Sequence, residues 1–189
     1  MKSLYDWQTE IANNGKRILE DEGMLYLALF PRTGKTPITL EIIKRTYAAD
    51  VAVLFVTTKS AIPGIYKVID EFGYEDMKIH VVNYESLHKV NYVYDVIVLD
   101  EAHAKISKFP KPSKSYKELK RLIDGKTDII YLSGTPKIES NSKLFHQLSL
   151  CPNHPWRRYK SFYEWHSGYS EWLQPNGKIV RRSYDYKPN

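Results

Sequence analysis

A short turn-like segment, FPRTGKT, occupies residues 30–36 between an apolar run and an amphipathic one. A phosphate-binding loop has this context, because it follows a buried strand and opens a helix whose N–H groups and positive dipole end face an anion. Lys35 would reach the β- and γ-phosphates of a nucleotide, and the Thr36 hydroxyl would bind Mg²⁺. Gly34 would let the backbone approach the phosphates closely. The segment predicts a nucleotide site, with a lysine-bearing turn as the plain alternative for these residues alone.

The loop departs from the common pattern G-x-x-x-x-G-K-[ST] at its start. Leu29 occupies the position of the first glycine, and Arg32 and Thr33 fill the loop. Because Lys35 and Thr36 are retained, the residues that would contact nucleotide and metal are in place.

A second group of polar residues ends the run VIVLDEAH at residues 96–103. Four apolar residues precede Asp100 and Glu101, and ligands of α/β proteins bind at the carboxyl ends of strands. Asp100 would hold Mg²⁺ through water, and Glu101 would orient or deprotonate the attacking water. An acidic helix cap is the alternative, but a DEAH tetrad downstream of G-K-T favours the chemical roles. We therefore expect Lys35, Asp100 and Glu101 to be catalytic.

Apolar runs and amphipathic segments alternate over residues 1–150, as they do in parallel α/β domains. The runs read as strands buried on both faces; they are Leu25–Phe30, Val51–Thr57, Ile79–Val82, Val96–Leu99 and Ile129–Leu132. Helical spacing marks three segments; they are Trp7–Leu19, Thr36–Tyr47 and Ile62–Phe72. In the first of these, Ile11, Ile18 and Leu19 are the expected apolar positions. Prolines and lysines in Ser107–Ser115 predict a loop. The predicted fold is α/β, with a central, mostly parallel sheet flanked by helices.

Length and composition limit the remaining choices. The 189 residues suffice for one domain, which we place at residues 1–150, and residues 151–189 read as an aromatic and basic connector too short for its own core. The single cysteine, Cys151, excludes an internal disulfide and fits a reducing cytosol. A net charge of +6 is compatible with a polyanionic partner. No apolar stretch is long enough to span a membrane, and no apolar signal core opens the chain, so we expect a cytoplasmic protein.

Six motifs in order make the chain resemble the first RecA-like lobe of superfamily 2 helicases and translocases, closest to the Swi/Snf-like branch and to small phage helicases. They are LYDWQ (residues 4–8), PRTGKT (31–36), VTTKSAI (56–62), NYESL (83–87), DEAH (100–103) and SGTP (133–136). The resemblance implies a RecA-like P-loop NTPase fold with ATP and Mg²⁺ as cofactors. It implies an ATPase that couples hydrolysis to movement on nucleic acid, in the host cytoplasm if a phage encodes it.

The resemblance also implies roles for individual residues. Gln8 would read adenine, and the cofactor would contact the loop residues Arg32, Thr33, Gly34, Lys35 and Thr36. The motif III residues Ser133, Gly134 and Thr135, together with His103, would couple the ATP site to the nucleic-acid track. His103 and Ser133 are suited to hydrogen-bond each other, while an ordinary buried histidine is the alternative for His103.

Nucleic-acid contacts are expected at strand ends on the same edge as the phosphate loop. The small donors there suit phosphate oxygens and sequence-independent binding; they are Thr57, Thr58, Lys59, Ser60 and Asn83. Lysines of the loop after DEAH, including Lys108 and Lys111, can pair with phosphates. Loop capping and a solvated turn are the respective alternatives. The partner is DNA or RNA.

The motors of this family close ATP between two lobes, and the second lobe supplies arginine fingers from motif VI. No such motif follows here, so we expect a second RecA-like lobe in cis or in trans, and slow hydrolysis without it. A nucleotide- or DNA-binding regulatory module without turnover, and a motor lobe of a restriction-system subunit, are the alternative functions. We expect the tail aromatics, such as Trp156, Phe162 and Trp165, to pack on the domain or on the missing lobe rather than to stack bases. His146, Cys151 and His154 lack a CxxC pair, so core or surface placement is favoured over a zinc site.

Overall fold

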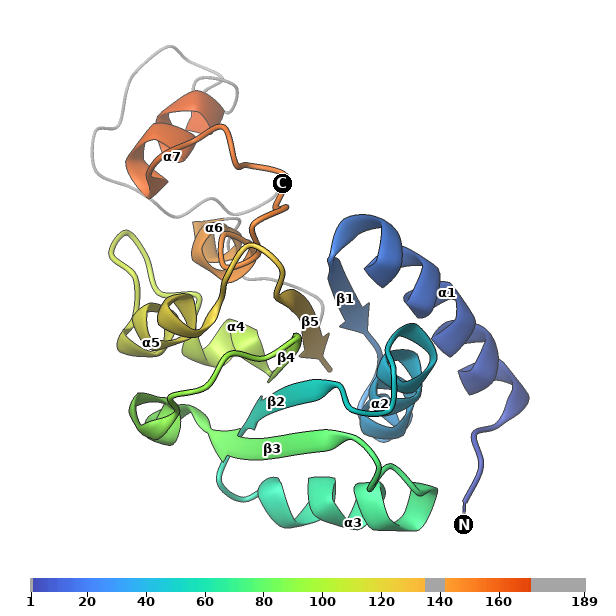
Figure 1. Ribbon diagram of the computed structural model, residues 1–189. Coiled ribbons are helices and arrows are strands. Elements are labelled where there is room, and N and C mark those ends of the chain that lie inside the picture. The colour runs from blue at the N-terminus through green and yellow to red at the C-terminus, as the bar shows by residue number, and fades with distance from the viewer. Residues whose placement is uncertain (1, 135–141, 171–189) are drawn as a thin grey trace.

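The computed structural model describes residues 2–134 and 142–170. Five strands form one sheet in the order β1-β5-β4-β2-β3 (Figure 1). They are β1 (Met24–Ala28), β2 (Ala52–Thr57), β3 (Lys78–Asn83), β4 (Val96–Asp100) and β5 (Asp128–Ser133). Every neighbouring pair is parallel, so all five carboxyl ends lie at one edge of the sheet. The predicted α/β class with a parallel sheet is confirmed.

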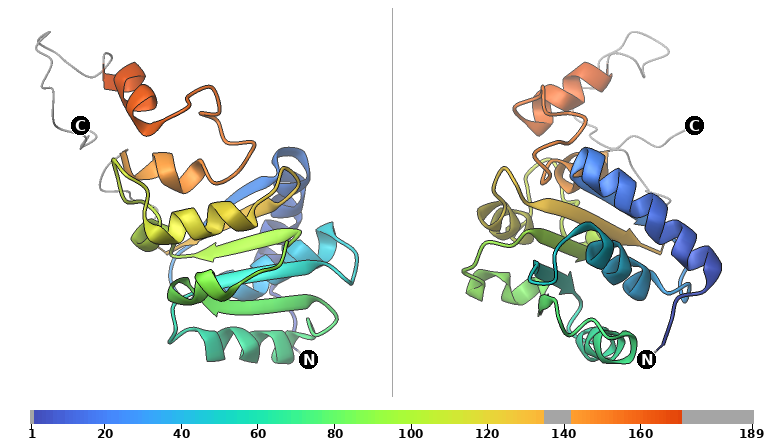
Figure 2. Two further views of the ribbon diagram at one scale, coloured as in Figure 1. Left: turned by 60° about the vertical axis from the view of Figure 1, so that its left-hand side comes forward. Right: turned by 45° about the vertical axis from the view of Figure 1, so that its right-hand side comes forward.

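Helices connect the strands and cover both faces of the sheet. They are α1 (Asp6–Glu22), α2 (Lys35–Thr46), α3 (Ile62–Phe72), the 3₁₀ helix η1 (Tyr84–Lys89), α4 (Ala102–Lys105), α5 (Lys114–Leu122), α6 (Ser142–Leu148) and α7 (Phe162–Ser170). Helices α1, α2 and α3 pack on one face, and η1, α4 and α5 pack on the other (Figures 1 and 2). No helix in the described part of the chain is long and apolar enough to cross a membrane.

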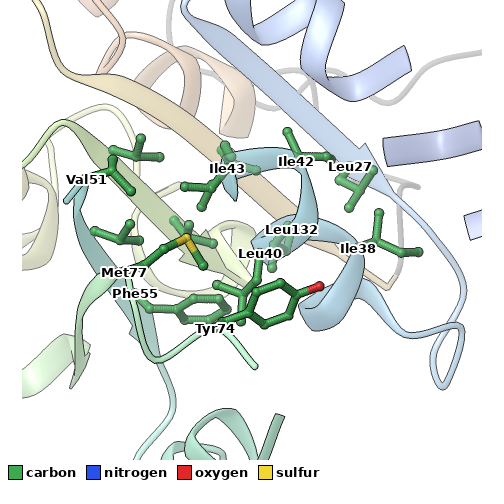
Figure 3. Packing of buried hydrophobic residues seen from close by; sticks show 14 of the residues in the cluster. Leu27, Ile38, Leu40, Ile42, Ile43, Val51, Phe55, Tyr74, Met77 and Leu132 are labelled. Carbon is green, nitrogen blue, oxygen red and sulfur yellow. The ribbon is translucent and has the colours of Figure 1, made fainter. Parts of the chain in front are cut away.

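The core is divided into two halves by the pleat of the sheet, because successive side chains of a strand point to opposite faces. In β2, Val53 and Phe55 join the cluster beneath α1, α2 and α3. Leu54 and Val56 join the cluster beneath η1, α4 and α5. Figure 3 shows the first cluster, where Phe55 lies near Leu40 of α2 and Tyr74.

Burial on both faces holds for the three central strands and not for the two edge strands. Every residue of β2 is buried, and β4 and β5 each have one partly exposed end. In β1 and β3 the pattern is interrupted by partly or fully exposed residues. The edge strands β1 and β3 each pair with one strand only and are less completely covered by helices. A short apolar run in the sequence therefore does not show whether its strand is buried on both faces.

Several predicted boundaries differ from the structure. Strand β1 ends at Ala28, and Phe30 is 78% exposed. Ile18 was expected in the core but is 46% exposed, whereas Leu19 is buried. The loop predicted over Ser107–Ser115 is wrong at its last two residues, because the Ser113 hydroxyl accepts a hydrogen bond from Tyr116 N at 3.1 Å and caps α5.

The described part of the tail packs against α6. Phe145 of α6 contacts Trp156, Phe162 and Trp165, with ring centroids 5.3–6.5 Å apart. Phe162 and Trp165 are buried. Of the two placements expected for these aromatics, on the domain or on a missing lobe, the structure shows the first, and the packing spans the predicted boundary at residues 150 and 151. The helix α7 was not predicted.

Candidate functional site

The segment between β1 and α2 has the backbone of a tight anion-facing loop. Gly34, the N-cap of α2, has a φ of 82°, and Arg32 has a φ of 65°. A Cβ atom added to Gly34 would lie 2.6 Å from the Gln8 amide nitrogen. Glycine is therefore required at this position both by the left-handed backbone and by the close approach of Gln8.

Gln8 braces this loop from α1. Its side chain is buried, and its Nε2 donates to the Thr33 carbonyl oxygen at 2.9 Å. Its Oε1 accepts from the Tyr5 backbone N–H at 3.0 Å. A primary amide offers two N–H groups and two lone pairs, so these two bonds leave capacity for a ligand. The structure thus brings Gln8 to the loop, and its contact with adenine stays a prediction.

Lys35 lies where three strands end. Its Nζ donates to the Leu29 and Phe30 carbonyl oxygens at 3.2 and 3.5 Å. The same Nζ lies 3.4 Å from the position that a Cβ atom would take on Gly134. Glu101 Oε1 accepts from the Gly134 N–H at 3.2 Å. The residues after β1, β4 and β5 are therefore brought together as the sequence predicted.

Asp100 ends β4 and has partners from two neighbouring elements. Its Oδ2 accepts from the Thr57 hydroxyl at 2.7 Å, and its carbonyl oxygen accepts from the Tyr84 hydroxyl at 2.8 Å. Burial raises the pKa of the Asp100 carboxyl above its ordinary value, while the Thr57 hydrogen bond opposes that shift. Sequence reasoning missed Tyr84, although its place directly after β3, on the same sheet edge, was a usable signal.

The residues after β4 and β5 meet through His103. Its Nδ1 lies 3.3 Å from Glu101 Oε2 and 3.4 Å from Ser133 Oγ. The pairing of His103 with Ser133 is therefore present. Glu101 itself adopts a left-handed backbone with a φ of 50°. Thr135 lies outside the described residues, and the coupling role of this group stays a prediction.

The residues at this edge fit ATP and Mg²⁺. The N-terminus of the twelve-residue helix α2 presents backbone N–H groups to an anion. Thr36 and Asp100 supply the oxygen ligands that Mg²⁺ prefers. The Asp100 carboxylate has about four lone-pair positions, so the bond from Thr57 leaves capacity for a metal ion.

A separate pocket of about 790 Å³ opens beyond β2 and β3, and we call it the strand-end pocket. Its lining residues are Thr58, Lys59, Ser60, Asn83, Glu85 and Lys105. Four of these were predicted nucleic-acid contacts. Thr58 and Ser60 lie 3.3 Å apart through their hydroxyls, and Asn83 Oδ1 accepts from Ser86 N at 2.9 Å.

The three remaining residues predicted to contact nucleic acid, Thr57, Lys108 and Lys111, lie outside the strand-end pocket. Thr57 is fully buried and gives its hydroxyl to Asp100, so the expected phosphate contact does not fit it. Lys111 is exposed but lines a different pocket from that of Lys59. Lys108 is also exposed, and its carbonyl oxygen contacts His146 Nδ1 at 2.8 Å. The exposed lysines predicted to contact nucleic acid therefore do not lie on one surface: Lys59 lines the strand-end pocket, Lys111 lines another pocket, and Lys108 lines neither.

No protein-family model matches the chain, and no curated protein matches it in sequence. Solved structures do match in fold. The Sulfolobus solfataricus SWI2/SNF2 ATPase core in complex with double-stranded DNA aligns with a TM-score of 0.68 and 19% identity over 88% of this chain. A nuclease-deletion mutant of the Type ISP restriction-modification enzyme LlaGI, with a DNA substrate mimic, aligns with a TM-score of 0.52 and 17% identity over 72%. The Pyrococcus furiosus Hef helicase domain aligns with a TM-score of 0.55 and 15% identity over 76%.

The chain spans only part of each of these proteins, namely 38%, 18% and 35% of their lengths. Identities of this size establish likeness of fold. The five-stranded parallel sheet with helices on both faces lies within the part of this chain that aligns with the SWI2/SNF2 ATPase core over 88% of its length. The chain therefore has a RecA-like α/β fold, as these similar ATPase and helicase domains do.

Proposed function

We propose that the chain is the ATP-binding first lobe of an ATP-dependent DNA helicase or translocase. The observation that carries the proposal is the convergence of Lys35, Asp100 and Glu101 at one edge of the sheet, where β1 and β4 lie on either side of β5. Phosphoryl transfer needs a cation on the phosphates, a metal ligand and a group that orients water. In the proposal Lys35 is the cation, Asp100 is the metal ligand and Glu101 is the group that orients water.

Each side chain has a definite task in this proposal. The N–H groups of the loop around Gly34 hold the phosphates, and Lys35 exchanges its loop carbonyl contacts for phosphate oxygens. Thr36 and Asp100 hold Mg²⁺, which when bound neutralises charge developing on the phosphates. Glu101 accepts the proton of the attacking water. His103 and Gly134 restrain the Glu101 carboxylate, as their contacts at 3.3 and 3.2 Å indicate.

Asp100 links this chemistry to the nucleic-acid surface. Thr57 ends β2 immediately before Thr58 of the strand-end pocket, and Tyr84 follows Asn83 of the same pocket. A shift of the β2 or β3 end on binding of a strand would therefore act directly on Asp100. This supports the proposed coupling of hydrolysis to movement along DNA.

DNA is the proposed partner because the similar SWI2/SNF2 core and the similar LlaGI enzyme were both solved with DNA. The exposed donors of the strand-end pocket suit phosphates rather than base edges, so binding is expected to be independent of sequence. A second RecA-like lobe, in cis or in trans, is the proposed source of the arginine finger. The proposed location is the cytoplasm.

Calorimetric titration of ATP in the presence of Mg²⁺ tests the nucleotide site. Lys35→Ala removes the phosphate contact and is expected to lower affinity by about 100-fold or more, to below detection. The control is Lys126→Ala, an exposed lysine before β5, which should bind ATP as the parent does. Equal ATP affinity of the Lys35 variant and the parent would contradict the assignment.

A motor lobe of a restriction system is the second candidate, favoured by the likeness to LlaGI. The two candidates share the ATP site and differ in the partner. Hydrolysis measured with and without DNA, for this chain alone and joined to a second lobe, separates both from a regulatory module. ATP binding without turnover in the joined protein would indicate the regulatory module.

A further inference from the structure

A second pocket, of about 410 Å³, lies between α5, the loop that precedes α5 and the segment that leads into α7. We call it the connector pocket, and Figure 1 shows these elements on the α4 and α5 side of the sheet. It shares no lining residue with the strand-end pocket. None of the residues assigned above to ATP or Mg²⁺ lines it.

The charge of the connector pocket is positive. Lys111, Lys120 and Lys160 line it, and no carboxylate stands among its described lining residues. The charges of Lys120 and Arg157 also act on His154, whose pKa is lowered by burial first and by these two cations second. An anionic ligand fits this wall better than a neutral or cationic one.

The other wall of the connector pocket is aromatic. Phe162 and His146 are buried, and their rings stack with centroids 5.7 Å apart and planes at 22°. Tyr163 is 48% exposed beside them, and Tyr116 contacts the His146 ring edge-on at 5.2 Å. The exposed Tyr163 ring, whose centroid lies 5.9 Å from that of Phe162, gives a planar base a surface to stack on whatever the base's identity.

One polar atom in this pocket is left without a partner. Within the described part of the chain, His154 Nδ1 is buried and makes no hydrogen bond. Buried polar atoms of this kind are nearly always satisfied by protein, water or a ligand. The pocket thus combines cations, flat rings and an unused ring nitrogen.

We propose that the connector pocket holds one nucleotide of a single nucleic-acid strand, its base on the aromatic wall and its phosphate at the lysines. The volume lies within the range of small-ligand pockets and suits a single nucleotide. The proposal rests on the proposed function only in taking nucleic acid as the ligand of the strand-end pocket. It adds a second contact that none of the six sequence motifs contains.

The two pockets lie along one short piece of chain, which favours a strand over a free nucleotide. Lys105 lines the strand-end pocket and Lys111 lines the connector pocket. Six residues span at most about 22 Å, which is about six nucleotides at roughly 3.4 Å each. A strand bound at the strand-end pocket therefore needs at most about six more nucleotides to cover the distance from Lys105 to Lys111.

Fluorescence anisotropy of labelled oligo(dT) of twelve nucleotides tests the proposal with the whole chain and without ATP. Tyr163→Ala is expected to weaken binding about fivefold or more through lost stacking. Tyr66→Ala is the matched control, because Tyr66 is also 48% exposed but lies on α3. The double variant Lys111→Ala with Lys160→Ala is expected to reduce the slope of log affinity against log salt by about 1.4, and Lys126→Ala is expected to leave it unchanged.

The outcomes are distinct. Equal effects of Tyr163→Ala and Tyr66→Ala on oligo(dT) would overturn the connector pocket as a strand site. Thymidine monophosphate that binds as tightly as oligo(dT), with the same loss in Tyr163→Ala, would assign the pocket to a free nucleotide and overturn the strand. If Lys59→Ala weakens oligo(dT) binding and Tyr163→Ala does not, the proposed function is supported and only the assignment of the connector pocket is overturned.

Discussion

The carboxyl edge of the sheet has two halves that are built differently. The nucleotide half follows β1, β5 and β4, and the strand-end half follows β2 and β3. The only described residues other than glycine with positive φ, Arg32 and Glu101, both lie in the nucleotide half. Such backbone costs about 1–3 kcal/mol for each residue. The strand-end half has no such residue among those described, and the binding proposed for it relies on side chains that line the strand-end pocket.

This difference in backbone strain and exposure bears on how each half would recognise the ligand proposed for it, ATP in one half and a nucleic-acid strand in the other. In the nucleotide half, Gln8, Gly34 and Glu101 are held by buried or close contacts, which preorganises the site for one ligand shape. In the strand-end half, Lys59 and Ser60 are exposed and Thr58 is partly exposed, which suits contacts with a phosphate backbone of any base sequence. Asp100 belongs to the first half but takes its hydrogen bond from Thr57 at the start of the second.

The largest expected effect concerns turnover in the nucleotide half. Glu101→Gln keeps the shape of the side chain and removes the base. In a protein that includes the second lobe, it should lower kcat by about 100-fold or more and leave ATP affinity nearly unchanged. Steady-state hydrolysis and calorimetry measure the two quantities. If ATP affinity falls as much as kcat, Glu101 holds the metal instead.

Variants of the neighbouring residues Thr57 and Thr58 test where the nucleotide half ends and the strand-end half begins. Thr57→Val removes the hydrogen bond to the Asp100 carboxylate, and a bond to a charged group contributes about 1.5–3 kcal/mol. Affinity for ATP with Mg²⁺ should fall about tenfold, with little change for ATP in the presence of a chelator.

Thr58→Val is the matched control for Thr57→Val. Its hydroxyl lies near Ser60 in the strand-end pocket, so it should leave ATP affinity unchanged and affect DNA alone. Equal loss of ATP affinity in both variants would show that the boundary does not fall between these residues.

A pair of glycines tests the preorganisation of the phosphate loop. Gly34→Ala forces a side chain into a left-handed backbone and against Gln8 Nε2, and should lower the free energy of unfolding by about 1–2 kcal/mol. Gly64→Ala in α3 meets open space and should raise it by about 0.5–1 kcal/mol. Urea unfolding of both variants measures the difference. A Gly34 variant as stable as the parent would be evidence against a strained loop.

The smallest expected effect lies in the strand-end half. Lys59→Ala should weaken DNA binding about threefold and reduce the salt slope by about 0.7 for a single strand, with ATP affinity unchanged. Titrations at two or more salt concentrations measure both. A loss confined to one DNA sequence would contradict recognition through phosphates.

Most of the fold followed from local patterns in the chain. Strands are present at the five apolar runs and helices at the three segments with helical spacing, because continuous apolar runs and 3.6-residue spacing are local properties. Helices α4, α5 and α6 were not predicted, since they are short and their ends depend on caps such as Ser113. The sequence also did not predict that β1 and β3 are the edge strands, because strand order depends on pairing between segments far apart in the chain.

The sequence by itself was enough to predict the chemistry proposed for the nucleotide half, because the types and order of Lys35, Thr36, Asp100 and Glu101 are those expected of a phosphate and metal site. Tertiary structure alone decided which hydroxyl serves which half. Thr57 and Thr58 are alike in sequence, but the pleat buries the first against Asp100 and leaves the second at the strand-end pocket. The connector pocket likewise arises only in three dimensions. Lys111 and Tyr163 are distant in the chain and meet because aromatic burial on Phe145 folds the connector back over α5 and α6.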